Sequence, residues 1–427
     1  MMKGMVMGIA TLEDIRRQCH NISDELIALR HELHQIPEPQ LYLPLTAKRI
    51  EKEINALGLE LTRCQTVTGM CAVLRGKAAH PDIHHRPIVL LRADMDALPV
   101  VEETGLEWAS TNGNMHGCGH DVHMAGLVGA MRVLYAHREE LKGDVVFFFQ
   151  SGEEGWNGAQ YMIDEGMLKV AGRMPDHAYG VHVWSARYPA GFIGTRKGAM
   201  MASSDTLKIT IVGRGGHGSA PHEVADPVPV LAELILAIQV MITREFDIFD
   251  PVVATCGHIH AGKVGNVIPD EAHAEYTLRA FSPQARTTLH SRISELAEGL
   301  ARSRGMEARI EFIPLYPVTV NDGAEVDFVQ EIVEATLPGR WAEQETPMAA
   351  AEDFAKILEH IPGCFVGISA VEQGEDHRHL SFNHSSRAHF SDSVIADCST
   401  VLAAAAYQRL TSPSLNESHP GKVLTQS

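Results

Sequence analysis

The segment Ile88-Val-Leu-Leu-Arg-Ala-Asp-Met-Asp96 places two aspartates directly after a short apolar run. Similar runs occur on both sides of it, at residues 71–74, 145–149 and 179–183. Segments whose apolar residues follow helical spacing separate these runs, most clearly residues 122–136 and 159–168. Strands that alternate with helices are typical of an α/β layer with a buried, mostly parallel sheet, and ligands bind at the carboxyl ends of such strands. The sequence therefore predicts a large α/β domain with its site at that edge.

A different pattern begins near residue 205. The chain reads strand, helix, strand, strand, helix, strand over residues 207–212, 228–242, 252–258, 273–280, 287–303 and 308–312. This order predicts a ferredoxin-like α+β domain. It is an insertion, because α/β material resumes with a helix at 352–359, a strand at 364–368 and a helix at 392–410. We expect a discontinuous catalytic α/β domain of residues 1–200 and 315–412, an inserted dimerisation domain of residues 201–314, and a loose tail of residues 413–427.

Composition narrows the function classes. A chain of 427 residues favours two domains, and a net charge of −18 without a Lys/Arg cluster argues against nucleic acid as a partner. Seven scattered cysteines without a CxxC pair argue against a disulfide framework. The N-terminus does not resemble a signal peptide, and we find no run of about 18 apolar residues, so we expect a cytoplasmic protein that does not bind membranes. An amphipathic helix is expected over residues 11–34, ending at the cluster Pro37, Pro39 and Pro44.

Ionisable side chains follow the predicted strands: Asp94 and Asp96, Glu153 and Glu154, and His182. Between them lies His116-Gly-Cys-Gly-His-Asp-Val-His123, whose glycines let a thiolate and imidazoles approach one point. Each feature has a simpler explanation. The glycine-rich segment could cap a helix, the glutamate pair could be a solvated loop, and His182 could be a core histidine. Their common position favours a metal site in which one carboxylate binds metal and the other moves protons.

Six segments carry a resemblance to a known family: residues 91–99 (LRADMDALP), 115–123 (MHGCGHDVH), 149–155 (FQSGEEG), 213–222 (GRGGHGSAPH), 265–269 (GNVIP) and 351–354 (AEDF). Together they closely resemble the M20 metallopeptidase family, in particular its branch of hippurate hydrolases and indole-acetyl-amino-acid amidohydrolases. The resemblance spans roughly residues 25 to 405, with the motifs in the family's order.

The resemblance implies a dinuclear centre of Mn, Zn or Co ions. Its metal ligands would be Cys118, His120, Glu154, His182 and His384. Glu153 would be the general base. Asp96 would orient a ligand, with Asp94 as a weaker candidate for that task.

The resemblance also implies that the inserted domain forms a homodimer and sends His217 into the partner's active site. Asn266 and Arg279 would contact the carbonyl or carboxylate of a small-molecule substrate. For Arg279 an ordinary strand-edge salt bridge is nearly as good an explanation. We expect the histidines at positions 222, 258 and 260 to be structural or solvent-facing.

Two departures from the family pattern bear on the substrate. Leu43 stands where the family commonly has a glutamate, and the segment His384-Ser-Ser386 replaces the common His-Asn-Pro. The leading expectation is hydrolysis of an N-acyl or N-aroyl amino acid by metal-bound water. The alternative is a hydrolytic deaminase of an aromatic amino-carboxylate, such as a substituted aminobenzoate, at the same centre. A non-catalytic binding homologue is a remote third possibility.

Overall fold

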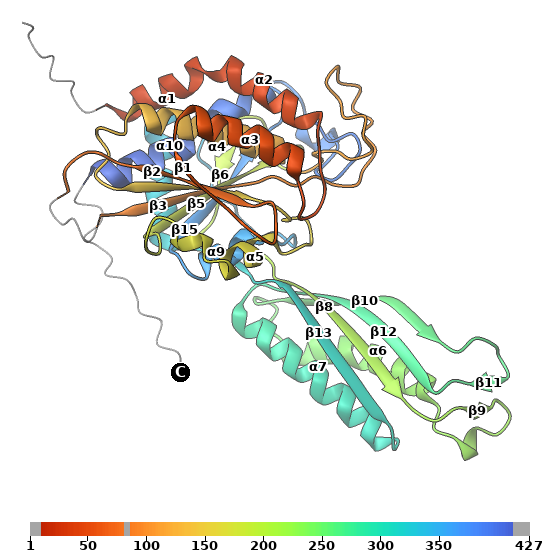
Figure 1. Ribbon diagram of the computed structural model, residues 1–427. Helices are drawn as coiled ribbons and strands as arrows, with labels where there is room; N and C mark the ends of the chain where they lie inside the picture. The colour runs from red at the N-terminus through yellow and green to blue at the C-terminus, as the bar shows by residue number, and fades with distance from the viewer. Residues whose placement is uncertain (1–9, 81–85, 413–427) are drawn as a thin grey trace, which may run out of the picture. The chain divides into compact units, whose positions relative to one another are not determined.

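The computed structural model describes residues 10–80 and 86–412 (Figure 1). The expected loose tail of residues 413–427 lies outside the described residues. The described chain forms two compact units. The first contains the residues up to Lys197, Asn321–Glu345 and those from Lys356 onward, and the second contains Gly198–Val320 and Thr346–Ala355.

The first unit is built on a seven-stranded sheet in the order β1-β2-β4-β3-β5-β15-β6. Its strands are β1 (Glu60–Arg63), β2 (Met70–Arg75), β3 (Ile88–Asp94), β4 (Asp144–Gln150), β5 (His177–Trp184), β6 (Ile193–Gly194) and β15 (Gly363–Ser369). The four central strands β4, β3, β5 and β15 run parallel, which confirms the predicted fold class. Strands β1, β2 and β6 extend the sheet in antiparallel fashion. Every residue of β3 and β4 is buried, as expected where helices cover both faces.

Helices form layers on this sheet. Helices α4 (His120–Ala136) and α10 (Ile395–Thr411) pack against one face, and α1 (Leu12–Asn21) and α2 (Ser23–His34) cover them. Helix α5 (Gly158–Asp164) lies on the opposite face (Figure 1). The remaining helices of this part of the chain are α3 (Pro44–Ala56), α8 (Gly323–Thr336) and α9 (Phe354–Leu358).

The N-terminal region differs from the sequence prediction in two places. The expected single helix over residues 11–34 is interrupted at Ile22, whose φ of −102° and ψ of 10° are not helical. Pro44, which was interpreted as part of a helix-ending cluster, instead begins α3. A proline is well suited to the first position of a helix, because the N–H that it lacks would have no helical partner there and its φ is already near the helical value.

The parallel strands bring the ionisable residues to one edge. Asp94 is the last residue of β3, β4 leads into Glu153 and Glu154, and His182 lies two residues before the end of β5. Since β3, β4 and β5 are adjacent and parallel, their carboxyl ends meet at the same edge. The ionisable residues therefore gather at one edge of the sheet, as the strand order predicts, and their role as a site stays a prediction.

The second unit has the predicted ferredoxin-like topology. Its four-stranded antiparallel sheet has the order β10-β12-β8-β13, with β8 (Ser204–Val212), β10 (Val252–Ala261), β12 (Glu271–Ala280) and β13 (Glu307–Tyr316). Helices α6 (Pro227–Glu245) and α7 (Pro283–Ser303) pack on one face. Short strands complete the described elements: β7 (Gly198–Met201) with β14 (Thr319–Asn321), and β9 (Gly216–His217) with β11 (Val267–Ile268).

Helix α6 is unusually apolar, although the sequence analysis found no run of about 18 apolar residues. Within the described ranges it is the one helix long and apolar enough to span a membrane by length and composition, with a mean hydropathy of 1.5. Its side chains Val230, Leu234 and Ile238 are buried in the core of the second unit. These side chains account for only part of the apolar composition, because 33% of the apolar window is buried.

Candidate metal centre

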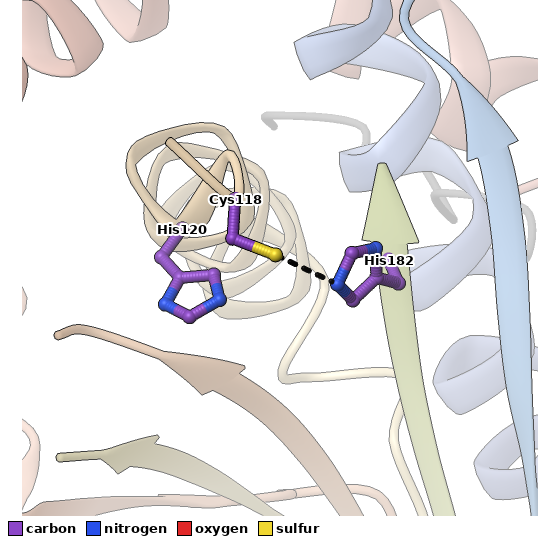
Figure 2. A group of neighbouring side chains, drawn as sticks. All are labelled: Cys118, His120 and His182. Carbon is purple, nitrogen blue, oxygen red and sulfur yellow. Dashed lines mark hydrogen bonds between the residues drawn. The ribbon is translucent and has the colours of Figure 1, made fainter. Parts of the chain in front are cut away.

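Three of the predicted ligands converge at the carboxyl edge of the sheet. Cys118 and His120 lie at the start of α4, and His182 projects from β5 toward them (Figure 2). Cys118 Sγ lies 3.5 Å from His182 Nε2. One donor atom from each of the three residues lies within 4.8 Å of the others, close enough for all three to bind one ion.

The other two predicted ligands join the same cluster through Cys118. His384 Nε2 lies 3.3 Å from Cys118 Sγ and 3.1 Å from Glu154 Oε1. Cys118, Glu154 and His384 form a second group that could hold an ion, and Cys118 belongs to both groups. The structure thus brings all five predicted ligands together, around a thiol that two ions could share.

The imidazoles are oriented by main-chain carbonyls. His120 Nδ1 lies 2.7 Å from the carbonyl oxygen of Asp96, and His182 Nδ1 lies 2.9 Å from that of Val183. Because a carbonyl only accepts, each Nδ1 must donate, which leaves each Nε2 with a lone pair facing the cluster. His120 Nε2 is buried and has no hydrogen-bond partner. An unpartnered buried nitrogen facing a thiol and carboxylates fits a metal ligand, and the mixed Cys, His and Glu set suits Zn²⁺, Co²⁺ or Mn²⁺.

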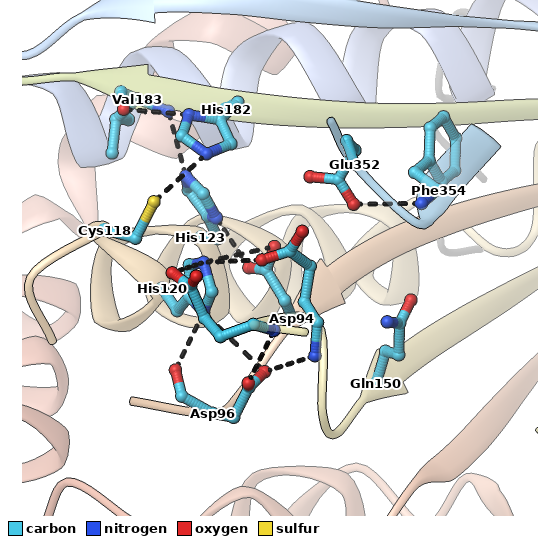
Figure 3. A network of polar contacts seen from close by, with 12 residues as sticks. Asp94, Asp96, Cys118, His120, His123, Gln150, His182, Val183, Glu352 and Phe354 are labelled. Atoms are coloured by element: carbon cyan, nitrogen blue, oxygen red, sulfur yellow. Dashed lines mark hydrogen bonds and ion pairs between the residues drawn. The ribbon is translucent and has the colours of Figure 1, made fainter. Parts of the chain in front are cut away.

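The two aspartates have separate tasks, seen in the network of Figure 3. The Asp96 carboxylate accepts from the main-chain N–H groups of Glu153 (2.8 Å) and Glu154 (3.0 Å). Its closest approach to His120 is the 3.8 Å between Oδ1 and Nδ1. Asp96 therefore fixes the turn that carries the two glutamates through its carboxylate, and it contacts His120 through its main-chain carbonyl. Its role in orienting a metal ligand stays a prediction.

The second aspartate, Asp94, lies close to the imidazoles of His120 and His123. Its carboxylate bonds His123 Nδ1 at 2.6 Å and accepts from Arg92 Nη1 at 2.6 Å. It also lies 3.6 Å from His120 Nε2. The other nitrogen of His123 accepts from the main-chain N–H of Val183 at 2.9 Å. Asp94 and His123 thus join α4 to the end of β5, next to His182.

Burial sets the charge states of the site. It lowers the pKa of His120, and it lowers the pKa of His182 well below the ordinary value, so both rings are neutral as metal binding requires. Burial and the carboxylates of Glu154 and Glu153 raise the pKa of the Cys118 thiol. Although burial alone would raise the pKa of Asp94, Arg92 and the two histidines hold it well below its ordinary range. A divalent cation among these groups would favour the thiolate.

Two backbone conformations shape the cluster. Gly119, between Cys118 and His120, has a φ of 85°, and a Cβ there would lie 2.4 Å from Val183 Cγ2. Only glycine fits this position without strain. His384 has a φ of 72°, which is rare for a residue with a side chain, and its N–H donates to Gly117 O at 2.7 Å. The last candidate ligand is therefore tied directly to the segment that carries Cys118.

The three predicted substrate residues lie in the second unit. His217 is on β9, and the adjacent Gly218 N–H donates to Asn266 O at 2.9 Å. Arg279 lies near the opposite end of β12 from these strands, and it donates to Thr277 Oγ1 at 2.8 Å and to Leu278 O at 2.9 Å. The structure groups His217 with Asn266 and separates both from Arg279. Their roles toward a substrate stay predictions.

Two further residues that were not predicted as site residues lie close to the candidate ligands in the chain, and one of them, Asn383, supports the cluster. Asn383 donates to the carbonyl oxygens of Val183 (3.0 Å) and Cys118 (3.3 Å), so it links β5, the Cys118 segment and the His384 segment. His116, which opens the glycine-rich motif, is buried with neither ring nitrogen hydrogen-bonded, and burial lowers its pKa to about 3. Asn383 could have been found from the sequence, because it directly precedes the candidate ligand His384.

The histidines expected to be structural or solvent-facing, His222, His258 and His260, are all exposed.

Comparisons with known proteins agree with this geometry. The model of peptidase family M20/M25/M40 matches residues 90–408. The hippurate hydrolase of Campylobacter jejuni is 32% identical over 91% of this chain and 98% of its own length. The thermostable carboxypeptidase 1 of Saccharolobus solfataricus is 32% identical over 90% of this chain and 95% of its own.

Among solved structures, the YXEP protein of Bacillus subtilis, a dinuclear metal-binding peptidase from the M20 family, superposes with a TM-score of 0.77. It is 30% identical, and the match covers 92% of this chain and 99% of that one. The family match over residues 90–408 reaches into both units of the fold and includes all five candidate metal ligands. This chain belongs to the M20/M25/M40 peptidase family and is a hydrolase that acts on C–N bonds.

Proposed function

We propose that the protein hydrolyses the amide bond of an N-acyl or N-aroyl amino acid at a centre of two divalent metal ions. The observation that carries the proposal is the convergence of five donor residues around Cys118, in two groups that each offer three donor atoms within 4.8 Å of one another. The hippurate hydrolase relative, whose substrate is an N-aroyl amino acid by its name, supports this substrate class.

Held by Cys118, His120, Glu154, His182 and His384, the ions would lower the pKa of a bound water and polarise the scissile carbonyl. Glu153 accepts the proton of the attacking water and delivers it to the leaving nitrogen. Its Oε2 lies 3.9 Å from His120 Nε2, and the Asp96 carboxylate fixes its main chain. Glu153 is buried, so the proton that it holds is shielded from bulk water.

The proposal includes a homodimer through the second unit. His217 adjoins the start of β12, whereas Arg279 lies near its end, eight residues after Glu271 and thus about 27 Å away along the strand. One copy of this unit does not bring both residues to a single small substrate, but two copies can. Apolar side chains that are exposed on α6 and on the edge strand β10, among them Leu236 (69%) and Ile259 (57%), offer a surface for the second copy.

One observation favours the deaminase as a second candidate. Phe382 lies two residues before the segment that departs from the family pattern. Its ring stacks on Trp184 with the ring centres 6.1 Å apart, and Trp184 stacks on His182 at 4.1 Å. Phe382 is 43% exposed. An exposed aromatic ring two residues before a candidate ligand is a suitable surface for a planar aromatic substrate. An aromatic amino-carboxylate that loses ammonia to water at the same centre would use it, and so would the aryl group of an N-aroyl amino acid, so the products decide between the two.

The test is metal loading followed by product identification. Metal-free protein is loaded separately with Mn²⁺, Zn²⁺ and Co²⁺, offered N-benzoyl, N-acetyl and indole-acetyl amino acids and electron-poor aminobenzoates, and the products are identified by mass spectrometry. Release of a free amino acid supports the amidohydrolase. Release of ammonia with formation of a phenol would replace it with the deaminase, and no turnover despite full metal occupancy would contradict both.

The variant Glu153→Gln tests the proton carrier. We expect it to keep the metal content of the wild type and to lose turnover by about 10²- to 10⁴-fold, the usual contribution of a general base. Metal content measured by elemental analysis separates this from loss of the centre. Wild-type turnover in the variant would remove Glu153 from the mechanism.

A further inference from the structure

Two basic residues of α2 bind the aspartate that follows a candidate ligand. Arg30 Nε donates to Asp121 Oδ2 at 2.8 Å, and His34 Nδ1 bonds the same oxygen at 2.9 Å. The two residues are one helical turn apart, so both side chains leave the same face of α2. Arg30 is 1% exposed and His34 is 2% exposed, and Asp121 is fully buried. Asp121 is covalently joined to His120, so its position affects where that imidazole lies.

Arg30 also holds the segment that follows the last candidate ligand. Its Nη1 donates to Phe390 O and to Asp392 Oδ1, both at 2.7 Å. The Phe390 ring lies against Gly119, because a Cβ there would be 3.0 Å from the ring. The Arg30 guanidinium therefore binds two residues that flank Gly119: Asp121, two positions later in the chain, and Phe390, whose ring packs on Gly119.

His34 connects this group to a third segment. Its Nε2 bonds Glu102 Oε2 at 3.0 Å, and Glu102 accepts from the main-chain N–H of Ser110 at 2.7 Å. Trp108, from the same loop, covers the group, with its ring 4.8 Å from the Arg30 guanidinium carbon. The cover excludes water from charged hydrogen bonds that are short and directional.

We propose that Arg30 and His34 are positioning residues of the metal centre, which hold the Cys118–His120 segment and the segment after His384 at the spacing that two ions require. The proposal rests on the metal centre proposed above. Neither residue touches the cluster itself. Arg30 acts through Asp121 and Phe390, and His34 acts through Asp121. Residues that orient metal ligands in this way typically contribute 10- to 100-fold to metal affinity.

The fold offers a matched control at the other end of the sheet. Arg409 is 6% exposed, and its Nη2 donates to Glu325 Oε2 at 2.8 Å. Its Nε donates to Tyr179 OH at 3.0 Å. Glu325 also bonds His177, the first residue of β5, far from the strand's carboxyl end. Arg409 resembles Arg30 in burial and in charge, but its partners adjoin no candidate ligand.

The test compares Arg30→Lys with Arg409→Lys. Each keeps a positive charge but loses the fork that donates to two groups at once. Competition with a chromogenic chelator gives the dissociation constants of Zn²⁺ and Co²⁺, and the thiolate-to-cobalt absorption band reports the geometry at Cys118. We expect Arg30→Lys to bind metal about 10- to 100-fold more weakly with an altered band. Arg409→Lys should stay within about threefold of the wild type with an unchanged band, even if its unfolding free energy falls similarly.

Equal losses of affinity in the two variants, or none in Arg30→Lys, would overturn the proposal. His34→Gln provides a second variant if Arg30→Lys does not fold, because it leaves Arg30 and its three acceptors in place. It should weaken metal binding in the same direction, and wild-type affinity in His34→Gln would then overturn the proposal. A wild-type protein that binds neither metal would refute the metal centre itself, and the positioning role with it. Metal binding without turnover on any substrate would refute only the proposed function.

Discussion

His34 makes the stability of the protein depend on pH in a way that can be isolated. Burial alone would lower the pKa of His34, but Asp121 and Glu102, which face its two ring nitrogens, raise it from 6.5 to about 9. A histidine whose pKa is raised on folding contributes its full stabilisation below pH 6.5, where the unfolded chain is protonated as well. The contribution is lost as the pH rises from 6.5 through about 9.

The size of the effect follows from this difference in pKa. At about 1.4 kcal/mol per pH unit, a rise from 6.5 to about 9 corresponds to about 3 kcal/mol of unfolding free energy. No discount for solvent screening is needed, because the side chain of His34 is 2% exposed. His34→Gln removes this contribution. The variant should therefore be less stable than the wild type at pH 6, and the gap should shrink by about 3 kcal/mol by pH 10.

The assay is urea denaturation of metal-free wild type and His34→Gln at 25 °C, at half-unit steps from pH 6 to pH 10. Buried thiols such as Cys19, whose pKa burial raises to about 12, also cost stability at high pH. Both proteins share these thiols, so the difference between the two unfolding free energies isolates His34. A difference that stays constant across the range would refute the argument that the two carboxylates hold His34 in its charged form.

Two other substitutions test the packing around the site and away from it. Gly119→Ala should lower the unfolding free energy by at least about 1–2 kcal/mol, because the left-handed conformation disfavours a Cβ, and the contact of that Cβ with Val183 should also weaken Zn²⁺ binding. Urea denaturation measures the stability and chelator competition measures the metal affinity. Wild-type values in both assays would show that the loop relaxes freely. Glu325→Gln should cost about 3–5 kcal/mol, because Arg409 stays buried without its anion. Its metal affinity should equal that of the wild type, and a loss would indicate that the two ends of the sheet are coupled.

The layers of the fold and the edge that carries the site could be predicted from local patterns. Buried strands that end in ionisable residues, such as β3 with Asp94, indicate both the parallel sheet and the place where its ligands gather. The βαββαβ order of the second unit is equally visible in sequence. Strand β2 was predicted from its apolar run at residues 71–74, but its antiparallel direction was not, because strand direction depends on connections rather than on composition. Strands β1 and β6 were not predicted.

What could not be predicted depends on contacts between distant residues. Arg30 lies 91 residues from Asp121 and 360 from Phe390, and nothing in the local sequence of α2 indicates those partners. The way in which Asp96 contacts His120 could not be predicted for a related reason. An aspartate near a histidine can orient the ring through its side-chain carboxylate or through its main-chain carbonyl. Which of the two contacts the ring depends on which main-chain N–H groups reach the carboxylate after folding.

The separation of Cys118 and His384 along the chain has a consequence for biosynthesis. The two residues meet at 3.3 Å but lie 266 positions apart. At translation rates of about 5–20 residues per second, the ribosome adds His384 about 13–50 s after Cys118. During that interval Gly198–Val320 is also synthesised, and it has a complete core of its own. The donor that completes the second group of candidate ligands is therefore synthesised last, after the other four and after the whole core of the second unit.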